Sequence, residues 1–272
     1  AGHEVSGCDN LIGGYLDNVP EDADFYQVDA IYLNQMKKLT KGADIVIHTA
    51  CTAYEGLSVF SPYLVGQNTY QISMSVFTAV ADNKIPKLIN CSSMARYGEQ
   101  ETVPFTEDMV PKPQDPYGIA KLASEESLKV MSKVHEFEFV NLVPHNIIGP
   151  KQKYDDPYRN VVSIMVNLML QNRQPIIYGD GNQKRCFSDI EDCIYCLDKL
   201  ITDKNVVSQT VNIGPDEEFI SINELFRIIS NKLKFNQEPK YFPDRLNEVK
   251  HATCSSSKAR KILNYKTSIS LS

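Results

Sequence analysis

Residues 87–98 read Lys-Leu-Ile-Asn-Cys-Ser-Ser-Met-Ala-Arg-Tyr-Gly, and this stretch begins with a short apolar run that predicts a buried strand at 87–90. Similar runs predict strands at 44–50 and 137–143, and apolar residues at helical spacing predict helices at 68–81 and 118–134. Strands that alternate with helices imply right-handed crossovers. The sequence therefore predicts an α/β fold with a doubly wound parallel sheet.

The pattern changes after Gly149-Pro150. A polar, turn-rich segment leads to a predicted helix at 161–171 and a short strand at 176–178, and Ser221 with Glu224 forms a capping box before another helix. We expect two parts, residues 1–150 and residues 151–272, of which the second is smaller and interleaved with the first.

Composition limits the partners and the compartment. The chain has 272 residues, a net charge of −6 and seven Cys without framework spacing. A negative chain is not expected to bind nucleic acid or an anionic membrane. Scattered, odd-numbered Cys are typical of reduced thiols in a cytoplasmic protein. No apolar run reaches the roughly 18 residues that a membrane span needs.

Three residues suggest the chemistry. Tyr117 and Lys121 are four residues apart, so a helix places them on one face, and the ammonium is expected to lower the phenol pKa. Ser93, from a separate segment, adds a hydroxyl that can relay or orient the same proton. This set suits reversible hydride chemistry at a carbinol, in which the oxygen loses a proton as the carbon loses hydride.

Taken together, these motifs resemble the extended short-chain dehydrogenase/reductase family, and within it the nucleotide-sugar epimerases. The resemblance runs from about His3 to Tyr265 and implies a Rossmann-like domain with a smaller C-terminal lobe for the nucleotide sugar. It implies that Tyr117 is the base, Ser93 its hydroxyl partner, and Lys121 both the pKa-setting group and a ribose contact.

The resemblance also assigns residues to NAD. Asp9-Asn10 matches the position that accepts from the adenosine ribose, Asp29-Ala30 the adenine contact, Thr49-Ala50-Cys51 the turn lining the cofactor, and Asn68 the nicotinamide side. A free ribose 2′-hydroxyl contact suggests NAD over its 2′-phosphorylated relative. The family begins with a strand and a Gly-x-x-Gly-x-x-Gly turn, and Gly13-Gly14 is too late and wrongly spaced for it. We therefore expect this turn upstream of Ala1, and the alternative is a protein that has lost tight cofactor binding.

A second set is assigned to a UDP-linked sugar. The residues that match family contacts to the sugar, diphosphate or base are Asn146, Asn160, Tyr178, Arg185 and Arg245. Paired Arg side chains suit a diphosphate. The family often has an Arg where this chain has Val143, so one expected contact is absent.

The reaction implied is epimerisation at C4 through a transient 4-keto sugar. Related dehydratases and decarboxylases carry carboxylates at the positions of Met94 and Ala95, where this chain has none. Ala252 matches a position where bulk excludes acetylated sugars, so both UDP-hexoses and UDP-N-acetylhexosamines are expected substrates. Another NAD(P)-dependent reductase or dehydratase, or a non-catalytic nucleotide-sugar-binding chain, remains the alternative.

Other features carry weaker expectations. Family members dimerise through helices like those at 68–81 and 118–134, so a homodimer is expected. Cys193 and Cys196 are interpreted as core residues, and no metal site is expected. Arg96, next to the catalytic motif, is interpreted with equal weight as a surface residue or a ligand contact.

Overall fold

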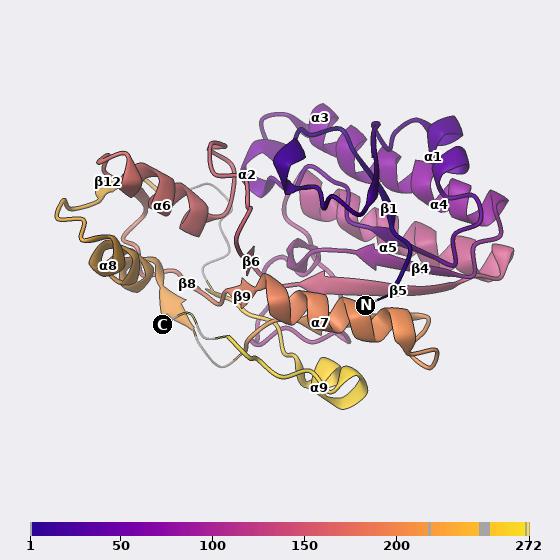
Figure 1. Cartoon of the computed structure of the whole chain (residues 1–272). Helices are drawn as coiled ribbons and strands as arrows, with labels where there is room; N and C mark the ends of the chain where they lie inside the picture. The colour runs from indigo at the N-terminus through magenta and orange to yellow at the C-terminus, as the bar shows by residue number, and fades with distance from the viewer. Residues whose placement is uncertain (1, 217–218, 245–250, 270, 272) are drawn as a thin grey trace. The chain divides into compact units, whose positions relative to one another are not determined.

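The structure is a computed structural model that describes residues 2–216, 219–244, 251–269 and 271. The chain divides into two compact units (Figure 1). The first unit comprises residues 1–96, 115–142 and 203–210, and the second comprises residues 97–114, 143–202 and 211–272.

The elements of the first unit, in chain order, are β1 (Ser6–Asp9), η1 (Leu16–Asn18), β2 (Asp24–Gln27), α1 (Leu33–Leu39), β3 (Ile45–His48), α2 (Glu55–Ser58), α3 (Pro62–Gly66), η2 (Gln67–Gln71), α4 (Ile72–Asp82), β4 (Lys87–Cys91), η3 (Met94–Arg96) and α5 (Pro116–His135). Two strands begin in this unit and end in the second, β5 (Glu138–Pro144) and β10 (Gln209–Ile213).

The elements of the second unit are β6 (Ile147–Ile148), α6 (Val161–Leu170), β7 (Ile176–Tyr178), β8 (Lys184–Arg185), β9 (Ser188–Asp189), α7 (Ile190–Thr202), β11 (Ile220–Ser221), α8 (Ile222–Leu233), β12 (Lys240–Phe242), β13 (His251–Ala252) and α9 (Ser257–Leu263).

The predicted parallel sheet is confirmed. Its strand order is β10-β5-β4-β3, with β3, β4 and β5 parallel, and β1 and β2 form a separate parallel pair. Leu88 and Ile89 on β4 are fully buried, as expected for a strand covered on both faces. Because parallel strands end at the same edge of a sheet, the segments that follow β3 and β4 are brought together there.

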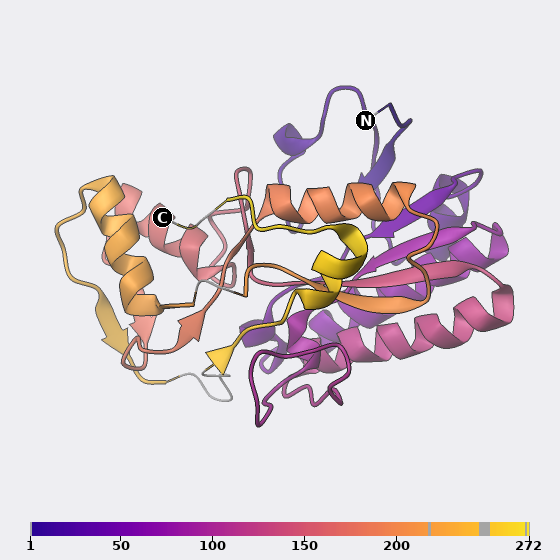
Figure 2. The ribbon, with the colours of Figure 1, turned by 90° about the horizontal axis from the view of Figure 1, so that it is seen from below.

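Helices α4 and α5 pack against each other, and Figure 2 shows α5 (pink) running alongside the strands of the sheet. Phe77 and Val80 of α4 join Leu128 of α5 in a core cluster, which holds α5 against α4. The helix predicted from residue 68 differs in detail, because η2 is a π-helical turn before α4 begins. The Asn68 side chain in this turn donates to Thr52.

The second unit has its own core, in which α6 and α8 pack side by side (Figure 1). The capping box that opens α8 is confirmed, since Ser221 and Glu224 satisfy each other's backbone N–H groups. Cys193 and Cys196 of α7 are buried free thiols, as interpreted from the sequence.

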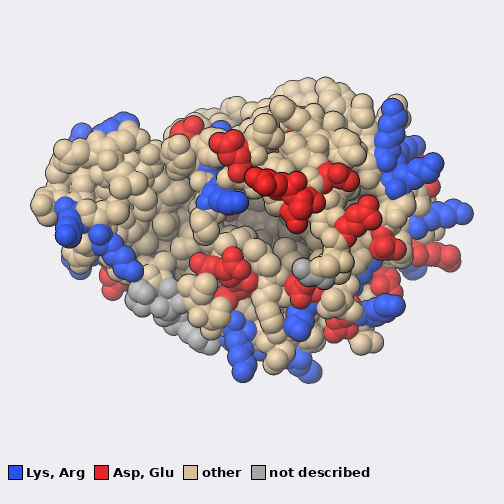
Figure 3. Space-filling model, viewed as in Figure 1, with Lys and Arg blue, Asp and Glu red and all other residues tan. Residues whose placement is uncertain are grey.

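The surface charge and the length of the helices bear on the possible binding partners and on membrane spanning. On the face drawn in Figure 3, acidic and basic side chains both occur, and basic residues do not form a continuous surface there. Within the described ranges, every helix is too short or too polar to cross a bilayer.

Candidate active site

The candidate base, Tyr117, lies in the first turn of α5. Asp115 is the N-cap of this helix, and its carboxylate accepts hydrogen bonds from the backbone N–H groups of Tyr117 (2.9 Å) and Gly118 (3.0 Å). Pro116 at the first helical position has no N–H to satisfy. The local sequence therefore fixes where the helix begins and where the phenol is presented.

Tyr117, Lys121 and Ser93 are brought together. The Ser93 hydroxyl donates to the Tyr117 hydroxyl, and the Lys121 ammonium lies 6.0 Å from the centre of the Tyr117 ring. Lys121 is 3% exposed, and its Nζ donates to the backbone carbonyl of Cys91 at 2.7 Å. A lysine that is buried in this way is held at a fixed place beside the phenol.

The expectation that Lys121 lowers the pKa of Tyr117 is wrong for this structure. Burial, the largest cause, raises the Tyr117 pKa well above its ordinary value, and the charge of Cys51 also raises it. The hydrogen bond from Ser93 acts in the opposite direction. The phenolate would lose its hydration on burial, and the Lys121 ammonium donates to the Cys91 carbonyl.

Arg96 is buried, so the interpretation of this residue as a surface residue is wrong, and the interpretation as a ligand contact stays a prediction. It is 3% exposed, and its Nε lies 3.0 Å from Oε1 of Glu125 on α5. Ser92 donates to the same carboxylate oxygen. Burial raises the Glu125 pKa, and the Arg96 charge lowers it.

The predicted ribose and adenine residues lie together at the carboxyl ends of β1 and β2. The Asn10 amide donates to Oδ2 of Asp29 at 2.9 Å, and Asp9 accepts from the Leu11 backbone N–H at 2.6 Å. Both carboxylates lie near Cys8, whose pKa is raised first by burial and then by these two charges. Two acidic side chains at this edge form a hydrogen-bond-accepting site.

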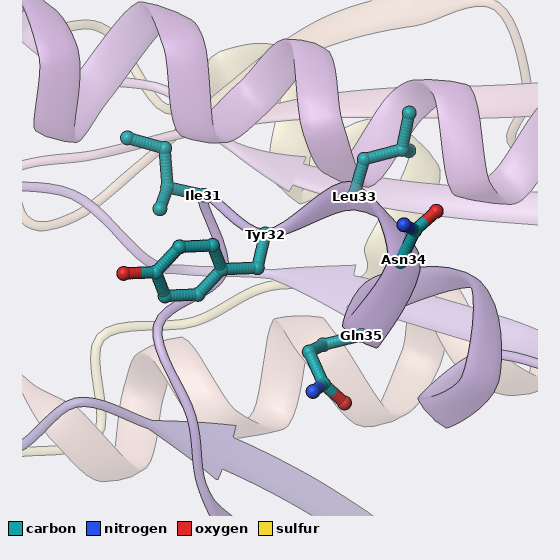
Figure 4. A pocket seen from close by; sticks show the side chains of 5 residues that line it. All are labelled: Ile31, Tyr32, Leu33, Asn34 and Gln35. Carbon is teal, nitrogen blue, oxygen red and sulfur yellow. The ribbon is translucent and has the colours of Figure 1, made fainter.

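Ala30 is buried beside Asp29, and an open surface pocket follows it along the chain. Figure 4 shows that pocket and the side chains that line it, Ile31, Tyr32, Leu33, Asn34 and Gln35.

Thr49 and Ala50 follow β3 directly, at the same edge of the sheet as Ser93. Asn68 is 8% exposed and donates to Thr52 at 3.0 Å. All the residues predicted to contact the cofactor thus belong to the first unit, and they follow the carboxyl ends of its parallel strands or lie on α5 and η2.

Two of the predicted sugar-nucleotide residues are neighbours in the second unit. β8 lies between β11 and β13, and Arg185 is the register partner of Ala252 in the parallel pair β8–β13. Ala252 is buried with a small side chain. Tyr178 ends β7 and packs near Phe242, with ring centres 6.2 Å apart.

Asn146 and Asn160 also have defined places in this unit. Asn146 has a positive φ of 42°, and its amide donates to the Cys186 carbonyl at 2.9 Å. Asn160 is the N-cap of α6 and accepts from the Val162 N–H at 3.0 Å, so it opens that helix as expected. Arg245 lies outside the described residues.

Cys51, the last residue of the predicted cofactor turn, hydrogen-bonds with the Tyr117 hydroxyl. Sequence reasoning missed Glu125, which lies beside this site on α5. Glu125, which pairs with Arg96, follows Lys121 by four residues. The spacing Tyr117, Lys121, Glu125 repeats the helical i, i+4 step and could have indicated Glu125.

Comparisons with known proteins identify the family of this chain. Residues 1–214 match the NAD dependent epimerase/dehydratase family. A putative UDP-glucose 4-epimerase of Methanocaldococcus jannaschii is 32% identical over 251 residues, which cover 91% of this chain and 80% of that protein.

Two solved structures are similar over nearly the whole chain. The UDP-glucose 4-epimerase of Thermotoga maritima, solved with UDP-glucose, has a TM-score of 0.94 at 26% identity and covers 99% of this chain and 87% of its own. The UDP-N-acetylglucosamine 4-epimerase of Methanobrevibacter ruminantium, in complex with UDP-N-acetylmuramic acid, has a TM-score of 0.89 at 29% identity, with 97% and 85% covered. This chain belongs to the NAD dependent epimerase/dehydratase family.

Proposed function

We propose that this protein interconverts nucleotide sugars that differ at C4, with NAD as a cofactor that is regenerated in each cycle. The observation that carries this function is the buried Tyr117 phenol with Ser93 donating to it and Lys121 fixed beside it, in a chain of this family.

The residues present fit NAD. Asp9 and Asp29 offer carboxylate oxygens at the carboxyl ends of parallel strands, where ribose hydroxyls are bound in such folds. The buried Lys121 offers two further N–H bonds besides the one to Cys91. When bound, NAD supplies the acceptor and later the donor of the hydride.

The protein's own residues handle the proton. Tyr117 removes the proton from the sugar 4-hydroxyl, and Ser93 holds the phenol oxygen in line with that hydroxyl. When the 4-keto sugar has turned over in the site, Tyr117 returns the proton. Positioned acid–base catalysis of this kind contributes roughly 10²–10⁴-fold to the rate.

Epimerisation is favoured over elimination or decarboxylation by the residues beside Ser93. Met94 and Ala95 begin the short helix η3 and provide no acid or base for a second step at C5 or C6. The ketone formed at C4 is therefore only reduced again.

We propose that the sugar is UDP-linked and that an acetamido group at C2 is tolerated. The relative solved with UDP-glucose and the UDP-N-acetylglucosamine 4-epimerase both support UDP as the nucleotide. Ala252, with a methyl side chain next to Arg185 in the sheet, supports room for the larger sugar.

A deuterium experiment tests the reaction. UDP-[4-²H]glucose is incubated with protein that has been supplied with NAD, and the product sugar is analysed by NMR. We expect UDP-galactose that keeps its deuterium, without net formation of NADH. Deuterium lost to water would refute hydride transfer, stoichiometric NADH would favour a dehydrogenase, and no turnover would favour a binding protein.

We further propose that the protein is a homodimer and acts in the cytoplasm. Ile119, Val130 and Val134 on α5 are 54%, 64% and 68% exposed, and Tyr63 on the neighbouring α3 is 82% exposed. Exposed apolar side chains gathered on adjacent helices support a subunit interface. All seven Cys lie outside disulfides, which supports a reducing compartment. Light scattering should give twice the chain mass, and Val130→Asp should halve it.

A further inference from the structure

Three buried polar side chains form a cluster behind the candidate base. Arg96 Nε lies 3.0 Å from Glu125 Oε1, and Ser92 donates to the same oxygen. The exposed fractions of Ser92, Arg96 and Glu125 are 4%, 3% and 0%. The proton-transfer steps above use none of the three.

Stability alone does not account for this cluster. Two charges removed from water lose hydration, and apolar side chains of similar volume usually stabilise a core as well or better. A buried ion pair does, however, fix the relative position of the two segments that carry it, because each charge left alone would be strongly unfavourable.

The two segments are those that carry the catalytic groups. Tyr117, Lys121 and Glu125 follow one another at four-residue steps on α5, so all three face the same side. On that side, Lys121 binds the Cys91 carbonyl and Glu125 binds the Ser92 hydroxyl.

Residues 92–96, the Ser93 loop, are also bound to the Glu125 carboxylate at their C-terminal end. Arg96 pairs with Glu125 and also donates its backbone N–H to the Ser93 carbonyl at 3.2 Å. Ser93 therefore lies between two residues, Ser92 and Arg96, that both bind Glu125. Its hydroxyl meets Tyr117 as a consequence.

We propose that Arg96 and Glu125 are positioning residues, which hold Ser93 against Tyr117 during proton transfer. This role rests on the proposed function, and it assigns to the pair an effect on kcat that is transmitted through Ser93. Neither side chain needs to contact the sugar or the cofactor.

The test is a double-mutant cycle on the full chain. The variant Arg96→Met/Glu125→Met keeps the volume and removes both charges, so no charge is left buried alone. We expect kcat for UDP-glucose to fall at least tenfold while KM and bound NAD are unchanged. In the Ser93→Ala background, the same pair of substitutions should lower kcat by less than twofold.

Leu128→Ala is the matched control. This residue is fully buried three positions after Glu125 on the same helix, and truncating it opens a cavity in the core cluster with Phe77 and Val80, to which residues 92–96 do not belong. Its melting temperature should fall while kcat at 25 °C is unchanged, which separates positioning from general destabilisation.

Two outcomes overturn the proposal: wild-type kcat in the Met/Met variant, or an equal further loss in the Ser93→Ala background. A second measurement does not depend on activity. The ¹³Cζ resonance of Tyr117, assigned with Tyr117→Phe, should move in the Met/Met variant as it does in Ser93→Ala, and an unmoved signal contradicts the proposal. An inactive wild-type protein with the expected shift would refute the proposed function alone.

Discussion

Asp115 offers the sharpest test of how the fold presents the catalytic tyrosine. Its carboxylate accepts from the N–H groups of Tyr117 and Gly118 and from the Ser58 hydroxyl at 3.2 Å. Loss of an N-cap costs about 1 kcal/mol, with a range of roughly 0.5–2. Ser58 keeps its bond to the Glu55 carbonyl, so the loss of its bond to Asp115 adds little.

The variant Asp115→Ala should therefore lower the free energy of unfolding by about 1–2 kcal/mol. For a chain of this size, this corresponds to a melting temperature lower by roughly 2–4 °C. Because the freed turn carries Tyr117, kcat should also fall by about tenfold, since a displacement of 1 Å in a catalytic group costs up to ~10²-fold. Calorimetry and a coupled UDP-galactose assay measure the two effects.

Two control variants sharpen this prediction. Asp115→Asn keeps a capping oxygen and should lose less than about 0.5 kcal/mol, with kcat nearly unchanged. Ser221→Ala removes the N-cap of α8 in the second unit and should cost a similar ~1 kcal/mol without changing kcat. If Asp115→Ala has wild-type kcat, or Ser221→Ala loses as much kcat, the reasoning is refuted.

Three further predictions follow from the same structure. Ser93→Ala removes the hydrogen bond that lowers the Tyr117 pKa, so a smaller fraction of Tyr117 is phenolate at a given pH. The rising limb of kcat against pH should therefore move to higher pH. An unmoved limb would show that Ser93 does not act on the phenol. Burial lowers the His48 pKa to about 3, so between the ordinary value of 6.5 and pH 3 only the unfolded chain gains the proton. The contribution of His48 to the free energy of unfolding should therefore fall by about 2 kcal/mol between pH 6.5 and 5. Calorimetry should show that the free energy of unfolding of His48→Gln declines less steeply over this pH range than that of the wild type. Ala252→Tyr should lower kcat/KM for UDP-N-acetylglucosamine at least tenfold and leave UDP-glucose turnover within about threefold; equal losses for both sugars would contradict the assigned role of this position.

The sequence was sufficient for three strands of the central sheet, because its signals there are strong and local, but it did not predict the fourth strand, β10. The apolar runs around β3, β4 and β5 predicted those strands to within two residues, and the capping box predicted where α8 begins. Helix periodicity could not reveal the π-helical turn η2, since the apolar spacing changes little across a single wider turn.

Electrostatics was where the sequence failed. Four-residue spacing correctly placed Lys121 near Tyr117, but it could not show that the ammonium is directed at the Cys91 carbonyl or that burial dominates the phenol pKa. The partner of Arg96 is 29 positions away in sequence, and nothing local to residue 96 indicates that Glu125 is buried beside it. Such pairs depend on tertiary packing, which periodicity does not encode.

The central claim is that the buried Tyr117, in its phenolate form, accepts the proton of the sugar 4-hydroxyl and becomes the neutral phenol. The most direct measurement is kcat for UDP-glucose in Tyr117→Phe, with the bound NAD quantified by mass spectrometry after denaturation. We expect kcat to fall by roughly 10²–10⁴-fold while the NAD content and melting temperature stay close to wild type. A variant that keeps more than about a tenth of wild-type kcat would contradict the account.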